Sequence, residues 1–333
     1  MQHAVTSPRP VNVVLTGASS GIGRATALAF ARNRARLAIA ARGEEALATV
    51  ADECRALGAE VLVVPTDVTD ATAVQALADA AIARFGHVDV WVNNVGVGVV
   101  GLFDRTPIEA HRRVIEANLI GHMNGAHVAL GHFRRRGRGV LINMISIAGW
   151  AAAPYAAAYS ASKFGLRGLS DALRAEMSTS PDVHVCAVYP TFVDTPGMTH
   201  GANYTGRNLK PPPPLVDPDI VARCVVAVAG APQASTYIGS VAAPARLAYA
   251  LAPGMVGRVA FLLIEAALAR AKPVRVTDGN LYSASVGNAV SGGYRVQRRA
   301  NAIGWGAAAG LAIAGLLAIS IGATKGRQGA PRR

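Results

Sequence analysis

The chain has 333 residues, of which 51% are hydrophobic and 16% are charged, so it has enough apolar side chains for a sizeable core and global disorder is excluded. The formal net charge is +13, but residues 1–240 hold 21 Lys and Arg against 18 Asp and Glu, whereas residues 241–333 hold 12 against 2. The basic excess belongs to the last part of the chain, and the nearly neutral remainder gives no indication of nucleic-acid binding.

Short apolar runs alternate with helix-prone stretches between residues 11 and 240. The predicted strands are Val11–Thr16, Leu37–Ala41, Val61–Pro65, Val88–Asn93, Val140–Ile145 and Val183–Val188, with a seventh near Ser235–Ile238. The predicted helices are Arg24–Asn33, Glu44–Leu57, Ala71–Phe85, Ile108–Arg135 and Tyr155–Met177. Continuous apolar strands that alternate with helices indicate an α/β fold, a doubly wound (Rossmann-like) parallel sheet with a helical C-terminal extension.

A glycine-rich turn joins the first predicted strand to the first predicted helix. Glycines allow a tight turn and let backbone N–H groups approach a pyrophosphate, which the positive end of the helix also attracts. The strand before the turn and the helix after it are the context that makes this motif a dinucleotide site. The candidate residues of the turn are Gly17, Ser19, Ser20, Gly21, Ile22 and Gly23.

The end of the second strand distinguishes between the two nicotinamide cofactors. NAD enzymes place an acidic residue there for the ribose hydroxyl, whereas a 2′-phosphate needs a cation. This chain has Arg42, whose planar guanidinium suits a phosphate, so NADP(H) is favoured over NAD(H). Asp67 and Val68 at the end of the third strand, and Asn94 at the end of the fourth, are expected to bind the adenine and the floor of the nucleotide site.

Tyr159 and Lys163 lie four residues apart and therefore on one face of a helix. A phenol is a poor base at neutral pH, but a nearby ammonium and an oxidised nicotinamide favour the phenolate. Lys163 could also bond the nicotinamide ribose. Ser146 follows the fifth strand and could hold a substrate oxygen. Asn118 lies inside a long predicted helix, where asparagine has poor propensity, which suggests a specific role.

In this order the glycine turn, Asn118, Ser146 and the Tyr159–Lys163 pair make residues 11–240 resemble the short-chain dehydrogenase/reductase family. The resemblance implies that Asn118, Ser146, Tyr159 and Lys163 form a catalytic tetrad, with Asn118 supporting a water relay from Lys163. It also implies an NADP-binding catalytic domain over residues 11–240 that interconverts a carbonyl and an alcohol.

The segment after the sixth strand matches the family's cofactor-binding turn. Within it, Pro190, Val193 and Thr195 are the implied cofactor contacts, with Thr195 on the nicotinamide carboxamide. The chain departs from the family pattern at two positions, since Thr191 replaces a usual Gly and Val95 a usual Ala. These changes bear on the local backbone geometry near the cofactor.

The extension divides into a helical and irregular part, 241–299, and an uncharged stretch, 300–324, that is bracketed by basic residues. About 25 residues at 1.5 Å rise could cross the ~30 Å core of a bilayer. A membrane-anchoring or transmembrane helix is therefore expected over 300–324, and a tail helix that is flexible or buried in a dimer is the alternative. We expect the protein to form a homo-oligomer.

The membrane anchor favours a small lipophilic carbonyl or alcohol as substrate. The sparse cysteines Cys54, Cys186 and Cys224 lack metal-site spacing and fit a reducing compartment, and no signal peptide precedes the first strand. We therefore expect a membrane-associated protein with its catalytic domain in the cytoplasm, without a metal. Two alternatives stay open, a soluble oligomeric reductase and a nucleotide-sensing interaction protein without catalysis.

Overall fold

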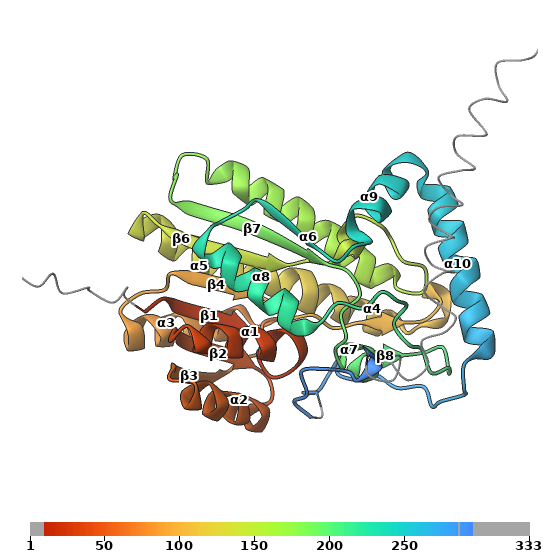
Figure 1. Cartoon of the computed structure of the whole chain (residues 1–333), viewed down its shortest axis with the longest axis horizontal. Coiled ribbons are helices and arrows are strands. Elements are labelled where there is room, and N and C mark those ends of the chain that lie inside the picture. Colours follow the sequence, from red (N-terminus) through yellow and green to blue (C-terminus); the bar gives the residue numbers. More distant parts are fainter. Residues whose placement is uncertain (1–9, 286, 296–333) are drawn as a thin grey trace, which may run out of the picture.

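The computed structural model describes residues 10–285 and 287–295, which are built around a seven-stranded sheet in which every pairing is parallel (Figure 1). Along the sheet the strands follow the order β3-β2-β1-β4-β6-β7-β9. Their bounds are β1 Asn12–Thr16, β2 Arg36–Ala41, β3 Glu60–Pro65, β4 Val90–Asn93, β6 Gly139–Met144, β7 Val183–Pro190 and β9 Ser235–Ile238. This confirms the predicted doubly wound fold. The strand order reverses between β1 and β4, where such sheets bind ligands.

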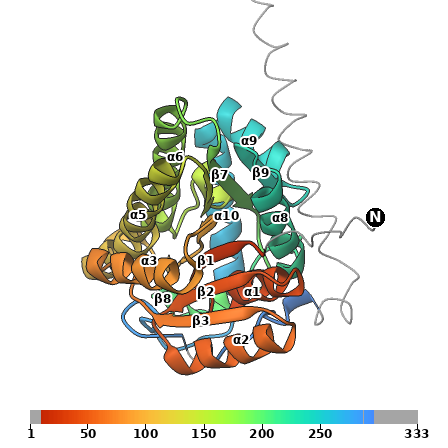
Figure 2. The same cartoon turned by 90° about the vertical axis from the view of Figure 1, so that its left-hand side faces the viewer.

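Helices cover both faces of the sheet (Figure 2). One face carries α1 (Gly21–Arg32), α2 (Glu44–Ala56) and α8 (Pro218–Gly230), and the other carries α3 (Ala71–Phe85), α5 (Gly121–Arg136) and α6 (Ala157–Glu176). Fully buried β-strand side chains such as Leu15 and Ile39 face the first layer, and Val14 and Leu141 face the second. The apolar strands are therefore covered on both sides, as their continuous hydrophobicity predicted. Sequence reasoning did not predict α8.

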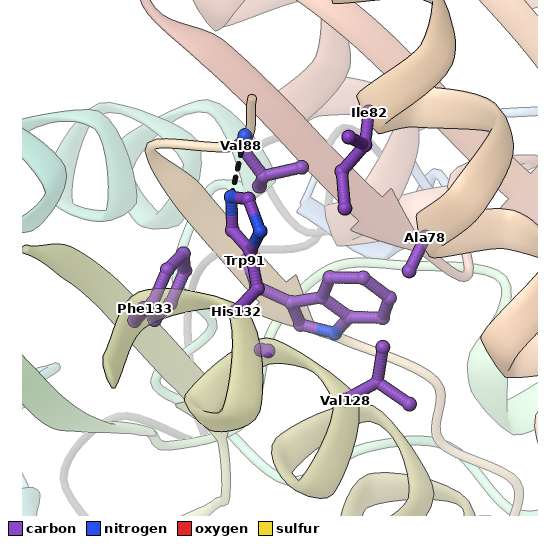
Figure 3. A pocket seen from close by; sticks show the side chains of 8 residues that line it. Ala78, Ile82, Val88, Trp91, Val128, His132 and Phe133 are labelled. Carbon is purple, nitrogen blue, oxygen red and sulfur yellow. Dashed lines mark hydrogen bonds between the residues drawn. The ribbon is translucent and has the colours of Figure 1, made fainter. Parts of the chain in front are cut away.

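The layer between the sheet and helices α3 and α5 is closely packed around Trp91 (Figure 3). The indole Nε1 donates to Asn93 Oδ1 at 2.8 Å, and the backbone N–H of Val88 donates to His132 Nε2 at 3.1 Å. The apolar cavity beside these residues measures only about 10 Å³. This gap has room for no more than a single water, so it is a packing defect and not a ligand site.

The helix predicted over 108–135 is interrupted in the middle. It consists of α4 (Ile108–Ile115), a π-helical turn η2 (Glu116–Ile120) and α5. Asn118 lies in that turn and is fully buried. Because π-turns insert an extra residue and are frequent at functional sites, the turn gives a structural reason for an asparagine at a position where helix propensity disfavours it.

The remaining elements lie at the carboxyl ends of the strands. They are β5 (Val99–Val100), η1 (Phe103–Arg105), η3 (Ile147–Gly149), α7 (Gly197–His200), β8 (Ala202–Asn203), α9 (Ala242–Leu251) and α10 (Pro253–Arg270). Helix α10 buries none of its residues completely and exposes more than half of the Leu262 and Leu263 side chains. Beyond α10, residues 271–285 and 287–293 form no helix or strand, and this segment returns to the end of the sheet, beside α7 and β8 (Figure 1).

The expected membrane segment, 300–324, lies outside the described residues. None of the helices within 10–295 combines the length and the hydropathy that a membrane crossing requires. Membrane attachment through 300–324 and homo-oligomerisation stay predictions, which fractionation and sizing of the full-length chain can test.

Candidate active site

The glycine turn leaves β1 at the point where the strand order reverses. Gly17 and Gly21 have φ values of +68° and +54°, which side-chain-bearing residues rarely adopt. A Cβ added to Gly23 would lie 1.9 Å from the carbonyl oxygen of Gly17. Asn94, at the end of β4, closes the turn from below because its Nδ2 donates to Gly17 O at 3.1 Å. The predicted turn residues therefore form a backbone-lined cradle at the N-terminus of α1, which fits a pyrophosphate.

Three charged groups gather beyond the ends of β2 and β3. Asp67 Oδ2 accepts from Arg113 Nη2 at 2.7 Å, and Asp67 Oδ1 accepts from the N–H and hydroxyl of Thr69. Burial acts to raise the pKa of Asp67, but these hydrogen bonds outweigh it and the pKa is lowered. Arg42 lies in the same charged cluster, and its own pKa is lowered, chiefly by burial. The sequence predicted Arg42 and Asp67 as site residues but not Arg113. The residue pattern of α4 does not show that the Arg113 guanidinium reaches Asp67.

The predicted catalytic residues come together between β6 and α6. Ser146 follows β6, and its hydroxyl forms a hydrogen bond with Tyr159. Lys163 Nζ lies 5.7 Å from the centre of the Tyr159 ring and donates to Met144 O at 3.0 Å. The Lys163 side chain is enclosed, since only 2% of the residue is exposed.

Burial dominates the ionisation of this pair. It raises the pKa of Tyr159 more than the hydrogen bond with Ser146 lowers it, and it lowers the pKa of Lys163 to about 7. We expected a nearby ammonium to favour the phenolate, but desolvation works against both charged forms. A phenolate at Tyr159 would therefore need an additional positive charge, such as that of an oxidised nicotinamide.

Asn118 fixes the backbone opposite α6. Its Oδ1 accepts from the N–H of Val97 at 2.8 Å, and its Nδ2 donates to Val97 O at 2.9 Å and to Ser162 Oγ at 3.2 Å. Asn118 thus joins the strand-four loop to the helix that carries Tyr159 and Lys163. The three atoms that bond to the Asn118 side chain belong to Val97 and Ser162, and Lys163 is not among these partners.

The segment after β7 brings its predicted contacts to the edge of the cradle. Pro190 ends β7, Val193 bridges to Val216, and Thr195 lies within 3.4 Å of a Cβ added to Gly21. Thr191, which replaces the family's usual Gly, is accommodated because Gly239 opposite it has no side chain. A Cβ added to Gly239 would lie 2.1 Å from the Thr191 hydroxyl oxygen. At the other departure, Val95, the backbone carbonyl oxygen forms a hydrogen bond with His122 Nε2 at 2.8 Å.

His122 is a buried neutral histidine near Lys163. Burial, and secondarily the charge of Lys163, lowers its pKa from 6.5 to about 3, and its Nδ1 has no hydrogen-bond partner among the described residues. The unfolded chain then binds more protons than the folded chain below pH 6.5. Above pH 6.5, His122 should therefore not lower the free energy of unfolding. As the pH drops from 6.5 towards 3, the free energy of unfolding should fall by up to about 1.4 kcal/mol per pH unit.

Urea denaturation between pH 5 and 7.5 measures this slope. The variant His122→Asn should have a flatter slope than the wild type, and His127→Asn, which removes an exposed histidine from the same helix, is the control. Equal slopes in all three proteins would show that His122 does not contribute.

Comparison with known proteins agrees with this arrangement. The model of the short chain dehydrogenase family matches residues 11–204, which contain the cradle, Ser146, Tyr159 and Lys163. The chain belongs to the short-chain dehydrogenase family. It is therefore an oxidoreductase that acts on hydroxyl or carbonyl groups with a nicotinamide cofactor.

Relatives of this short-chain dehydrogenase include the uncharacterised oxidoreductase YxnA of Bacillus subtilis, 33% identical over 250 residues, 74% of this chain and 70% of the relative. The 11-beta-hydroxysteroid dehydrogenase A of Arachis hypogaea is 37% identical over 185 residues, but the match spans only 55% of this chain and 52% of that protein.

Two solved structures are similar to 70% of this short-chain dehydrogenase at 30% identity. One is an alcohol dehydrogenase from the archaeon Thermococcus sibiricus with 5-hydroxy-NADP, with a TM-score of 0.62 over 98% of its chain. The other is a variant of the actinorhodin polyketide ketoreductase with NADPH, with a TM-score of 0.65 over 97% of its chain. In both comparisons the similarity covers nearly the whole of the solved chain, so about 30% of this chain lies outside the matched part.

Proposed function

We propose that this chain is an NADP(H)-dependent oxidoreductase that interconverts a carbonyl and an alcohol, with Tyr159 as the acid and base. The observation that carries the proposal is the hydrogen bond between Ser146 and Tyr159, with the enclosed Lys163 next to the phenol and the glycine cradle at the neighbouring switch point. Two of the similar structures hold NADP-type cofactors, which supports the same choice.

Each residue of the proposed site has a distinct task. The cofactor, when bound, supplies or accepts the hydride. In the reductive direction the Tyr159 hydroxyl donates its proton to the carbonyl oxygen, and Ser146 donates a hydrogen bond to that oxygen while negative charge develops on it. When it is protonated, Lys163 adds a positive charge 5.7 Å from the centre of the Tyr159 ring, and its Nζ is held by Met144 O. Asn118 positions the Val97 backbone and Ser162 against this group.

The preference for the phosphorylated cofactor depends on Arg42. Its guanidinium lies beyond the end of β2, where a 2′-phosphate would be, and Arg113 adds a second cation beside Asp67. We expect Arg42→Ala to weaken NADPH binding by about tenfold or more, the scale of one charge-assisted pair, and to leave NADH binding unweakened. Calorimetric titration of both cofactors measures this difference. Equal losses for NADPH and NADH would show that Arg42 does not contact the phosphate.

A lipophilic substrate is proposed from the surroundings of α6. A cavity of about 490 Å³ lies between residues 152–154, α6, α9 and α10. Its lining is largely apolar and includes Phe164, Tyr249 and Pro253. It adjoins the helix that carries Tyr159 but does not include Tyr159 itself. The exposed leucines of α10 lie on the same extension.

The overall proposal is tested by titrating the full chain with NADPH and NADH and then assaying carbonyl compounds of increasing chain length. NADPH binding with turnover that improves with apolar length supports it. Binding of neither cofactor overturns it, and turnover that favours short polar carbonyls overturns the lipophilic substrate alone.

A further inference from the structure

The irregular segment after α10 crosses the end of the sheet. Residues Thr277 and Pro273 bridge to Asn203 and Arg207, and the following residues turn back towards α1 (Figure 1). We use the name C-terminal strap for residues 280–292, of which 286 is not described. The strap lies outside the part of the chain that the family model matches.

Carbonyl groups of the strap occupy the donors that a dinucleotide phosphate would use. Arg42 donates from Nη1 to Leu281 O at 3.1 Å and from Nη2 to Asn280 O at 2.6 Å. The backbone N–H of Gly21 donates to Ala289 O at 2.9 Å. Carbonyl oxygens thus lie where the oxygens of a 2′-phosphate and of a pyrophosphate are expected, at two places of the same candidate dinucleotide site.

The strap is held firmly at both ends. At its start, Leu281 is fully buried in a cluster with Val97, Val114 and other residues near the active site. At its end, the buried Asp194 carboxylate accepts from Ser291 Oγ at 3.1 Å and from the backbone N–H groups of Tyr294 at 3.0 Å and Arg295 at 3.1 Å. These are specific contacts with a buried group and not the loose covering of a surface by a tail.

The glycine cradle and the segment after β7 lie close together where the strap crosses them. Thr195 approaches to 3.4 Å from a Cβ added to Gly21, so the cradle and the segment after β7 are in van der Waals contact. A single backbone N–H at Gly21 cannot serve Ala289 O and a phosphate oxygen fully at once. The strap and a bound dinucleotide therefore compete for the same donors.

We propose that the C-terminal strap is an intramolecular competitor that closes the dinucleotide groove and must leave it before the cofactor binds. The inference rests on the proposed function, because it assumes that NADP(H) uses Gly21 and Arg42. It makes the apparent affinity for cofactor depend on the fraction of molecules with an open strap. Any event that displaces the strap would activate the enzyme.

A reversible crosslink tests the competition directly. A Cβ added to Gly43 would lie 3.2 Å from the Cβ of Ala284, near the ~3.8 Å of disulfides. The full-length double variant Gly43→Cys/Ala284→Cys, oxidised, should bind NADPH at least about 100-fold more weakly than its reduced form, as measured by calorimetry. Wild-type protein treated with the same oxidant controls for Cys54, Cys186 and Cys224.

A steric variant tests the same point in the opposite direction. A Cβ added to Gly279 would lie 2.3 Å from His200 O, so Gly279→Ala should push the strap from its seat and tighten NADPH binding by about tenfold. Gly254→Ala is the control, because Gly254 is exposed at the start of α10, outside the strap, has no positive φ, and an added Cβ meets nothing within 4 Å. It should leave the affinity unchanged.

Hydrogen exchange gives a readout that does not depend on affinity. NADPH should speed exchange at the amides of Gly292, Tyr294 and Arg295, which now donate to Asp194. Slower exchange would mean that the strap clamps over bound cofactor, and would overturn the proposal.

The outcomes separate the strap from the proposed function. Equal NADPH binding by the oxidised and reduced double variant overturns the strap and leaves the proposed function intact. If the wild type, Gly279→Ala and the reduced double variant all fail to bind NADPH and NADH, the proposed function fails and the strap proposal fails with it. Weak binding by the wild type and strong binding by Gly279→Ala supports both.

Discussion

Replacing Tyr159 with Phe is expected to lower kcat by about a thousandfold, within the range of general acid–base catalysis, while the Kd for NADPH stays near that of the wild type. The substitution removes only the hydroxyl that bonds Ser146 and leaves the ring beside Lys163. Among the described residues, no other tyrosine forms a hydrogen bond with Ser146. The loss should therefore appear in the chemical step and not in cofactor binding.

Steady-state kinetics together with NADPH titration measure both quantities for Tyr159→Phe. Tyr237→Phe is the control, because it removes a hydroxyl that accepts from Arg246 at the surface and should keep wild-type kcat. Activity of Tyr159→Phe within about tenfold of the wild type would show that another group acts as the acid.

The second large effect is expected at the glycine cradle. In Gly23→Ala the new Cβ would lie 1.9 Å from Gly17 O and 2.6 Å from Asn94 Nδ2, and the backbone atom cannot move without opening the turn. We expect loss of binding of both cofactors and destabilisation by about 3 kcal/mol, the upper part of the range for overpacking.

Gly168→Ala is the matched control for Gly23→Ala. It is also a helical glycine, but it is exposed on α6 and an added Cβ meets nothing within 4 Å. It should bind cofactor normally and gain about 0.5–1 kcal/mol from the improved helix propensity. Urea denaturation and calorimetry report the two effects, and normal cofactor binding by Gly23→Ala would mean that the cradle does not hold the pyrophosphate.

The C-terminal strap changes how Arg42 should be interpreted. Its guanidinium is the proposed phosphate ligand, and it also donates hydrogen bonds to Leu281 O and Asn280 O. Arg42→Ala would remove the phosphate contact and loosen the strap at once. NADPH loses affinity by the first effect, whereas NADH, which has no 2′-phosphate, experiences only the second.

The sequence by itself determined the fold and brought forward the residues of the candidate site. Continuous apolar runs marked six strands of the main sheet, because a strand covered on both faces needs no polar residue, and the seventh was expected near Ser235–Ile238. The spacing of Tyr159 and Lys163 placed them on one helix face, and glycines marked a turn that permits no side chain at Gly23. These are local properties, so they can be read along the chain.

Only the tertiary structure decided what lies across the groove. Arg42 and Leu281 are 239 residues apart, and Arg113 reaches Asp67 and Leu281 O from a helix whose pattern shows only its buried face. The strap contacts the hydrogen-bond donors of Arg42 and Gly21 through backbone carbonyls, which every residue has. Residues 280–292 therefore have no periodicity or motif that could mark their destination, and the competition with cofactor follows from three-dimensional placement alone.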